Sequence, residues 1–227
     1  MAKTIEEFDS SSKTKEDWVY DQIKEDILRN NFQPGAVMVE RKIAEKYNVS
    51  RSPIRHALKQ LMGEGLLTKV PGTGIVVPVY TLEDVLQIYD LLEVLQIYAI
   101  QVSLKNYNQI ADTKLKYIVD EIDNDYKHKD LVARMEWDIE FHSFIINNVG
   151  NKRLDAMFEM LVNQKRRLDI TSYDDLEHGK ITTEQHKKIY EAILKRDEKA
   201  TIEAIQEHTR YIKKYYIDKL IVGKYRL

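Results

Sequence analysis

The sequence of 227 residues contains no cysteine. That absence excludes disulfide bonds and metal sites built from thiolates, and it fits a protein of the reducing cytoplasm. No apolar run approaches the roughly 20 residues that a membrane-spanning helix needs, and the segment before Trp18 lacks the apolar core of a signal peptide. We therefore expect a cytoplasmic protein with no membrane-bound part.

An excess of one charge is also lacking, because 35 Lys and Arg residues stand against 37 Asp and Glu residues. The overall charge of −2 gives no indication of a nucleic-acid partner. Between Arg41 and Lys69, however, seven Lys and Arg residues stand against two Asp and Glu residues, a local charge of +5. Such a segment can neutralise phosphates, although a solvated helix surface would have the same composition.

The chain length and a hydrophobic share of 43% suit two small domains, each with its own core. Residues 1–12 are polar and predict a flexible tail. Residues 13–79 predict three helices and a β-hairpin, the order of a winged helix-turn-helix. The expected elements are a helix over Lys15–Asn30, a helix over Glu40–Asn48, a helix that Ser50 caps and Gly63 ends, and strands over Leu66–Val70 and Gly74–Pro78 with a turn at Pro71–Gly74.

Residues 80–227 show apolar spacing typical of helices and no strand pattern. Thr81, followed by Glu83 and Asp84, predicts the first helix start, and about six helices are expected. The expected breaks fall near Asn106–Asp112, Asn124–Asp130, Asn147–Asn151 and Ser172–Gly179. The predicted fold is therefore mainly α, with a winged helix-turn-helix followed by an all-α helical-bundle domain.

The third helix is the candidate DNA-reading element. A helix-turn-helix places this helix in the major groove, where its N-terminal side chains reach base edges. Arg51 and Arg55 are four residues apart and share one face, and arginine forms bidentate contacts with guanine or phosphate. Ser50 and Ser52 can bind phosphate. The alternative is that these arginines are ordinary surface charges.

The N-terminal sequence resembles the GntR family of bacterial regulators. The resemblance rests on the stretches Glu40–Ala44, Val49–Leu58, Leu61 with Glu64–Leu67, and Pro71–Gly74, within residues 20–78. It implies DNA contacts at Arg41, Arg51, Arg55, Gly72 and Thr73. His56 stands where the family usually has an acidic residue, which leaves open what pairs with the second arginine.

Three histidines and one aspartate of the helical half form a candidate metal site. Asp138 and His142 are four residues apart on one helical face, and His186 and His208 lie on later helices beside apolar stripes. Singly, the Asp–His pair is more often a helix ion pair, and a histidine beside an apolar stripe is usually a hydrogen-bonded core residue. Together, imidazole and carboxylate suit zinc, nickel, manganese or iron.

Residues 81–217 resemble the FCD ligand-binding domain, the effector domain of one large GntR subfamily. The resemblance rests on Asp138 and His142, the run Gly150–Leu154, His186 and His208. It implies that Asp138, His142, His186 and His208 hold one divalent cation, against which a small organic acid binds. Leu92 stands where the family usually carries an arginine, so we expect Arg166 or Arg167 to bind the effector instead; both are equally consistent with surface charges.

The resulting hypothesis is a metabolite-responsive repressor or activator, a homodimer that binds an inverted-repeat operator in double-stranded DNA. Three alternatives remain for the helical half: a metal sensor, in which the ion is the signal; a metalloenzyme, in which the ion activates water; and a metal that is purely structural. The enzyme has the least support, since no general base beyond the four ligands, nucleophile motif or phosphate loop is evident.

Overall fold

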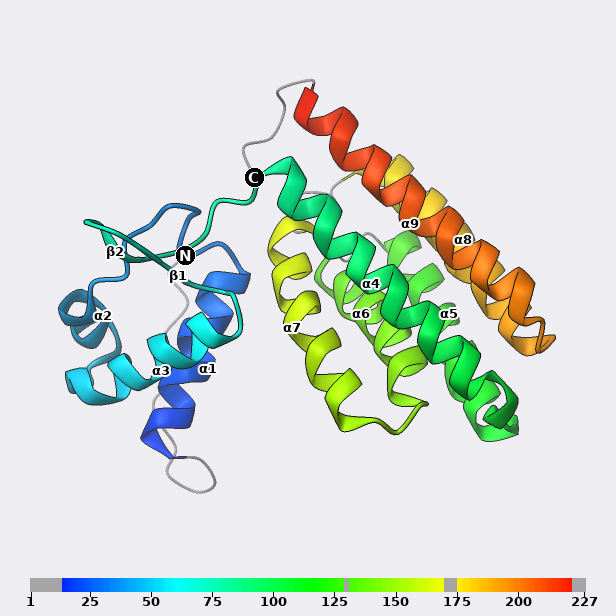
Figure 1. Ribbon diagram of the computed structural model, residues 1–227, viewed down its shortest axis with the longest axis horizontal. Helices are drawn as coiled ribbons and strands as arrows, with labels where there is room; N and C mark the ends of the chain where they lie inside the picture. Colours follow the sequence, from blue (N-terminus) through cyan, green and yellow to red (C-terminus); the bar gives the residue numbers. More distant parts are fainter. Residues whose placement is uncertain (1–13, 129–130, 170–174, 222–227) are drawn as a thin grey trace. The chain divides into compact units, whose positions relative to one another are not determined.

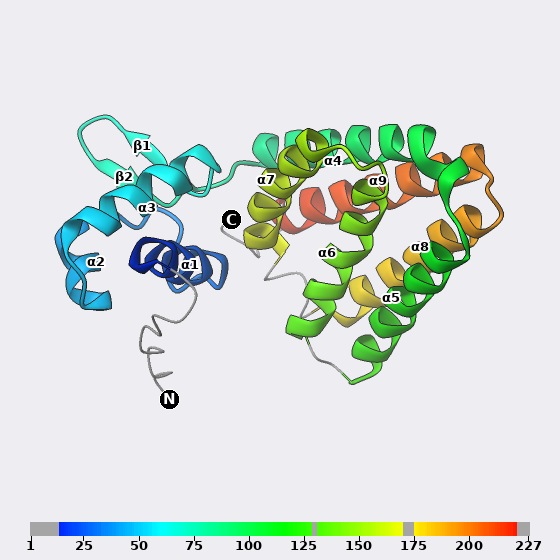
Figure 2. The ribbon, with the colours of Figure 1, turned by 90° about the horizontal axis from the view of Figure 1, so that it is seen from below.

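The computed structural model describes residues 14–128, 131–169 and 175–221. It divides into two compact units, an N-terminal unit, Met1–Val79, and a C-terminal unit, Tyr80–Leu227. Figure 1 and Figure 2 show the elements of both units.

The N-terminal unit contains three helices and a two-stranded hairpin, as predicted. These are α1 (Lys15–Leu28), α2 (Glu40–Tyr47), α3 (Arg51–Gly63), β1 (Thr68–Val70) and β2 (Gly74–Val76). A capping box between Thr14 and Asp17 begins α1, and Asn48 ends α2 because it adopts the left-handed conformation, with φ of 52°. Both α1 and α2 pack on α3, so α3 has one buried face and one exposed face.

The hairpin is shorter than predicted, because only three residues of each strand pair with the other. Val70 pairs with Gly74, and the turn between them needs positive φ at Gly72 (75°) and Gly74 (108°), which only glycine adopts without strain. Val37 forms an isolated bridge with Val76, an addition that the sequence analysis did not predict. Turn and strands together make the wing of a winged helix-turn-helix.

The C-terminal unit is all-helical, which confirms the predicted fold class. Its elements are α4 (Leu82–Ser103), the short 3-10 helix η1 (Leu104–Asn106), α5 (Gln109–His128), α6 (Leu131–Asn147), α7 (Lys152–Asp169), α8 (Leu176–Leu194) and α9 (Glu198–Ile221). Thr81 and Asp84 form the capping box that begins α4, at the predicted position.

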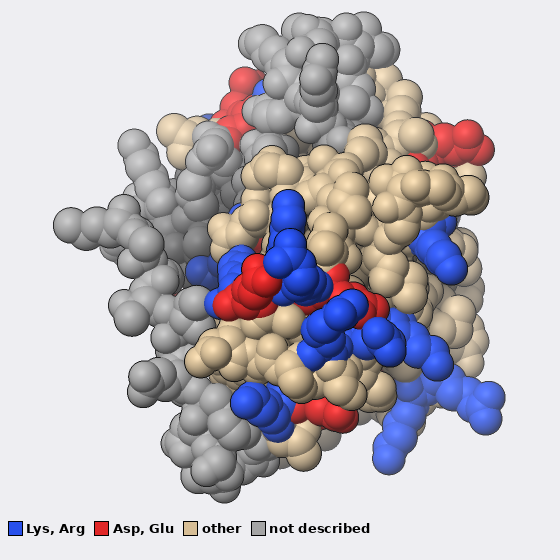
Figure 3. Space-filling view, turned by 90° about the vertical axis from the view of Figure 1, so that its left-hand side faces the viewer, with Lys and Arg blue, Asp and Glu red and all other residues tan. Residues whose placement is uncertain are grey.

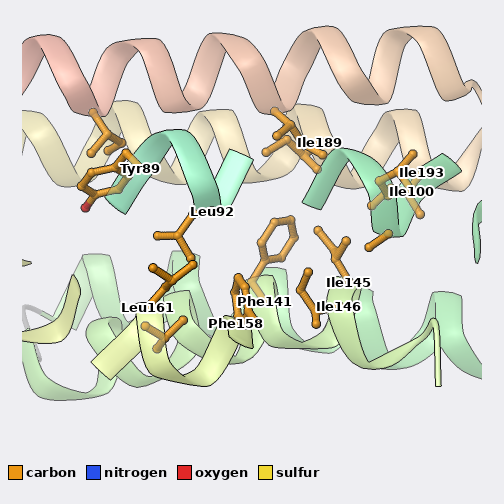
Figure 4. Packing of buried hydrophobic residues seen from close by; sticks show 14 of the residues in the cluster. Tyr89, Leu92, Ile100, Phe141, Ile145, Ile146, Phe158, Leu161, Ile189 and Ile193 are labelled. Carbon is orange, nitrogen blue, oxygen red and sulfur yellow. The ribbon is translucent and has the colours of Figure 1, made fainter. Parts of the chain in front are cut away.

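These six α-helices form a closed ring of neighbours. Helix α4 packs against α9, α9 against α8, α8 against α5, α5 against α6, α6 against α7, and α7 again against α4. The apolar core lies inside the ring, and Figure 4 shows Leu92 of α4 near Leu161 and Phe158 of α7, with Phe141 of α6 beside them. Side chains that point inward from different helices therefore meet within one enclosed volume.

The position of one break between helices was not predicted. Helix α8 ends at Leu194 and α9 begins at Glu198, and between them Arg196 adopts a left-handed conformation with φ of 56°. Arg196 is held there because its guanidinium donates to the backbone oxygens of Ile193 and Tyr107 and to the Asp112 carboxylate. A non-glycine residue in this conformation carries no simple sequence signal.

Helix α4 has two apolar faces. Together with η1, α4 is long and apolar enough to cross a membrane, because only Asp90 and Glu93 are charged between Val85 and Val102. The sequence analysis did not expect a helix of this kind. Core helices of soluble proteins can have the same length and apolar composition. One face of α4 is buried against α9, α7 and α6. The opposite face is exposed. It presents Leu91, Val94, Tyr98 and Val102.

Candidate functional site

Three buried histidines from three different helices meet inside the ring. Their ligand atoms all lie within 4.8 Å of one another, so they could hold a metal ion. His142 comes from α6, His186 from α8 and His208 from α9, and the Nε2 atoms of His142 and His186 are 3.2 Å apart. Asp138 lies one turn before His142, and its Oδ1 atom is 3.3 Å from His186 Nε2 and 3.7 Å from His142 Nε2.

Two glutamines orient two of these imidazoles. Gln96 donates from its amide nitrogen to the Leu92 backbone oxygen, so its Oε1 faces His142 Nδ1 at 2.6 Å. Gln185 Oε1 lies 2.9 Å from His208 Nδ1 in the same way. Since an amide oxygen can only accept, both Nδ1 atoms carry the proton, and both Nε2 atoms keep a lone pair for a ligand bond.

Burial keeps two of the imidazoles neutral, which metal binding requires. It lowers the pKa of His142 to about 3, with the Asp138 carboxylate opposing the shift. Burial, together with repulsion from the other imidazoles, lowers the pKa of His208 well below its usual value. The third imidazole has a buried Nδ1 atom that forms no hydrogen bond within the described chain, so His186 is held only through its Nε2 side.

A buried lysine shares the Asp138 carboxylate. Lys165 of α7 is 8% exposed, and its Nζ atom donates to Asp138 Oδ2 at 2.6 Å. Burial alone would raise the pKa of Asp138, but the Lys165 ammonium and the neighbouring imidazoles outweigh it and hold that pKa well below its usual range. Asp138 is therefore an ionised oxygen donor, and three imidazoles with one carboxylate fit a divalent metal ion.

A pocket that is partly open to solvent adjoins the histidines. Helices α4, α6, α7 and α9 contribute its walls. Its lining comprises Tyr89, Leu92, Gln96, Asp138, Ile139, His142, Phe158, Val162, Lys165, His208 and Thr209. The concave shape and the few polar groups are typical of a small-ligand site.

Of the two arginines predicted to bind the effector, Arg166 is absent from the described lining of this pocket. The guanidinium of Arg166 pairs with Glu136 of α6. The side chain of Arg167 lies outside the part of the chain that the structure describes. The roles of Arg166 and Arg167 stay predictions, and Lys165, which the sequence analysis missed, is the cation that lines the pocket.

In the N-terminal unit, the three predicted DNA-contacting arginines are all exposed. The exposed fractions of the side chains are 69% for Arg41, 63% for Arg51 and 71% for Arg55. Arg55 donates twice to the Glu40 carboxylate, at 3.1 and 3.0 Å, and Arg51 lies 3.9 Å from the same group. Glu40 of α2 is therefore the acidic partner of Arg55, the partner that His56 left open in the sequence analysis.

The remaining predicted contacts lie on exposed turns. Ser50 precedes α3 in an extended conformation and makes no capping hydrogen bond with its side chain, and Ser52 is exposed in the first turn. Gly72 and Thr73 are exposed at the end of the hairpin. Figure 3 shows Lys and Arg side chains gathered across the face of the molecule that it presents, with fewer acidic ones among them.

Both units match known family models. The model described as bacterial regulatory proteins of the gntR family matches residues 15–77, and the FCD domain model matches residues 87–211, more than half of the chain. The chain belongs to the GntR family. It is a GntR regulator with an FCD ligand-binding domain and is not an enzyme, because the family and its relatives are transcriptional regulators.

Individual relatives agree with this assignment. The Bacillus subtilis (strain 168) protein YdhC, an uncharacterized HTH-type transcriptional regulator, is 24% identical over 193 residues, which are 83% of this chain and 85% of YdhC. The structure of E. coli McbR/YncC is similar with a TM-score of 0.78 at 16% identity, covering 92% of this chain and all of that chain. A GntR regulator of Rhodococcus sp. RHA1 gives a TM-score of 0.77 at 21% identity, covering 94% and 100%. These structural likenesses show the shared fold.

Proposed function

We propose that this GntR regulator binds operator DNA with an affinity that a small carboxylate controls, and that the carboxylate binds at a divalent metal ion held by Asp138, His142, His186 and His208. The observation that carries the proposal is the meeting of three buried imidazoles beside an ionised carboxylate. Two of the imidazoles present their Nε2 lone pairs to a common point because Gln96 and Gln185 fix the opposite ring nitrogens.

The donor set is compatible with zinc, nickel, manganese or iron. Four protein ligands leave two positions of an octahedral ion open, and a bound ion would offer these to the carboxylate of an effector. The effector would approach these positions through the pocket beside His142 and His208, which is partly open to solvent. The protein's own part is to hold the imidazoles neutral and oriented and to limit the access of water.

In this proposal residues 13–79 bind DNA. Helix α3 enters the major groove, where Arg51 and Arg55 contact bases or phosphates. Arg41 and the hydroxyls of Ser50 and Ser52 bind the backbone, and the Gly72–Thr73 turn brings the wing close to the DNA. A phosphate that approaches Arg55 competes with Glu40, whose carboxylate holds that guanidinium in the absence of DNA.

Residues 80–227 form the effector domain and supply the homodimer contact. The exposed apolar stripe of α4 follows the helical spacing 91, 94, 98 and 102, and the side chains are 52%, 60%, 45% and 46% exposed. Such a stripe on a cytoplasmic protein is typical of an interface, and a second copy of the chain is the occupant that a two-fold operator requires. An inverted repeat is the matching DNA.

Effector control follows if the carboxylate binds one arrangement of the effector domain more tightly than another. The test loads the dimer with zinc and follows a selected DNA duplex in a gel-shift titration with small carboxylates, while native mass spectrometry counts bound ions. We expect one ion per chain and at least one acid that changes the DNA affinity. His186→Ala should lose the ion, whereas His178→Asn should retain it, because His178 is a buried histidine on the same helix that packs against the Tyr215 ring instead.

The alternatives give other results. If chelation alone releases the DNA and no acid changes the affinity, the ion itself is the signal. If neither metal nor acid changes the affinity, the ion is structural. Binding of no ion at all would overturn the proposed site.

A further inference from the structure

Lys165 is the one cationic side chain among the residues that line the pocket, all of which lie within the described chain. A lysine is almost never this buried unless it is paired. Its partner, Asp138, uses one oxygen for Lys165 and turns the other toward the imidazoles. The Asp138 carboxylate therefore lies between the Lys165 ammonium and the space that the imidazole Nε2 atoms surround.

The rest of the pocket is mainly apolar. Leu92, Ile139, Phe158 and Val162 form this part of the wall, and Figure 4 shows Leu92 facing the helix that carries Phe158. The Gln96 amide is already committed, because its nitrogen donates to a backbone oxygen and its oxygen accepts from His142. Few polar groups are left to solvate a second charged or hydroxylated end of a ligand.

The charges of the site predict an anionic ligand. Lys165 and Asp138 form a close pair of opposite charges. A divalent ion would leave a charge of +2 in a largely buried volume, a costly arrangement unless an anion enters. A carboxylate near both the ion and Lys165 reduces that excess where it arises.

We infer that the effector is a small monocarboxylate with an apolar body, whose carboxylate Lys165 binds and whose body lies against Leu92, Ile139, Phe158 and Val162. This inference rests on the proposed function and names its ligand class. Lys165 takes the role of the arginine that Leu92 replaces, but from a different helix. A dicarboxylate or a sugar acid would place its second polar end against the apolar wall, where the described lining residues offer no second cation.

The test uses full-length dimer loaded with cobalt(II), whose visible absorption reports ligands that reach the ion, together with calorimetric titration. The probes are isovalerate and phenylacetate as apolar monocarboxylates, succinate as a dicarboxylate, gluconate as a sugar acid, and isovaleramide as the uncharged match of isovalerate. We expect isovalerate or phenylacetate to bind at least tenfold more tightly than succinate, gluconate and isovaleramide, and to change the cobalt spectrum.

Two variants test the residues. Lys165→Met should weaken binding of the monocarboxylate about 10- to 100-fold, the value of a charge-assisted hydrogen bond, while native mass spectrometry shows the ion retained. Lys152→Met, an exposed lysine on the same helix, should leave the affinity unchanged. Leu92→Arg should gain succinate binding, because it puts a second cation in the wall.

Each result supports or overturns the inferred ligand class. If Lys165→Met binds isovalerate and phenylacetate as the wild type does, or if succinate or gluconate binds wild type most tightly, the inference is wrong while metal-dependent effector control stands. If no probe of any class binds the metal-loaded protein, the inference and the proposed function fail together.

Discussion

Replacing Gln96 with leucine tests the proposed metal site through a residue that is not itself a ligand. The Gln96 side chain is buried and accepts the His142 Nδ1 proton at 2.6 Å. Leucine has a similar size but no acceptor, so the ring of His142 loses the bond that fixes its tautomer and orientation. Loss of such an outer partner typically weakens metal binding about 10- to 100-fold.

That loss converts into a measurable change in stability. At free zinc of about 100 times the wild-type Kd, binding adds about 2.7 kcal/mol to the free energy of unfolding. A Kd weakened 10- or 100-fold leaves about 1.4 or about 0.4 kcal/mol at the same zinc concentration. At about 2–4 °C per kcal/mol for a protein of this size, the zinc-induced rise in Tm falls from about 5–11 °C to about 1–6 °C.

Differential scanning fluorimetry in zinc buffers measures this rise within each variant, so any change in stability without metal cancels. Gln96→Glu should keep the rise, because a carboxylate accepts the same proton. Gln87→Leu, at an exposed position on the same helix, should behave as wild type. A Gln96→Leu protein with the full wild-type rise would refute the role of Gln96 in orienting His142.

Three further results are expected. Burial lowers the pKa of His142 from 6.5 to about 3, so the unfolded chain takes up the proton first and the free energy of unfolding of metal-free protein falls as the pH drops from 6.5 toward 3. Urea unfolding at pH 7 and at pH 5 should show that this group costs about 2 kcal/mol of stability at the lower pH. His142→Gln should lack this loss, and an equal loss in the variant would contradict the prediction. Arg55→Ala should weaken binding to a selected DNA duplex and reduce by about 1 the slope of log affinity against log salt concentration. Fluorescence anisotropy measures both, and Arg29→Ala should bind as the wild type does. Unaltered binding by Arg55→Ala would show that this arginine is not in the interface. Val94→Glu should shift the protein toward monomer in sedimentation equilibrium. Ile110→Glu should not, although Ile110 on α5 is 80% exposed. A monomeric wild type or a dimeric Val94→Glu protein would exclude the α4 stripe as the dimer contact.

Local signals account for most of the fold that the sequence predicted. Thr81 with Asp84, and Asn48, act within one helical turn of the boundary that they mark, so a short window of sequence contains the whole cause. The break at Arg196 has a different origin. Its left-handed backbone is held by the Tyr107 carbonyl and the Asp112 side chain, which lie 89 and 84 residues away, and no neighbouring residue announces it.

The same distinction applies to the candidate site. Asp138 and His142 share a helical face by their spacing, which is visible in the sequence. Gln96 lies 46 residues from His142, and Lys165 lies 27 residues from Asp138, on helices that only the closed ring brings alongside. Glutamine and lysine are also common surface residues, so neither their type nor their spacing separated them from the rest of their helices.

The case of Leu92 shows why charge in a buried site belongs to the enclosed volume and not to a single position. Considered along α4 alone, leucine in place of the family's arginine removes the cation, and the sequence analysis looked for its replacement at Arg166 and Arg167. In the ring, α7 borders the same pocket as α4, and it is Lys165 that lines it beside Asp138. A cation that approaches from α7 leaves the α4 wall free to be apolar. The described lining therefore carries its positive charge beside the Asp138 carboxylate and the imidazoles, while the α4 wall is apolar at Leu92.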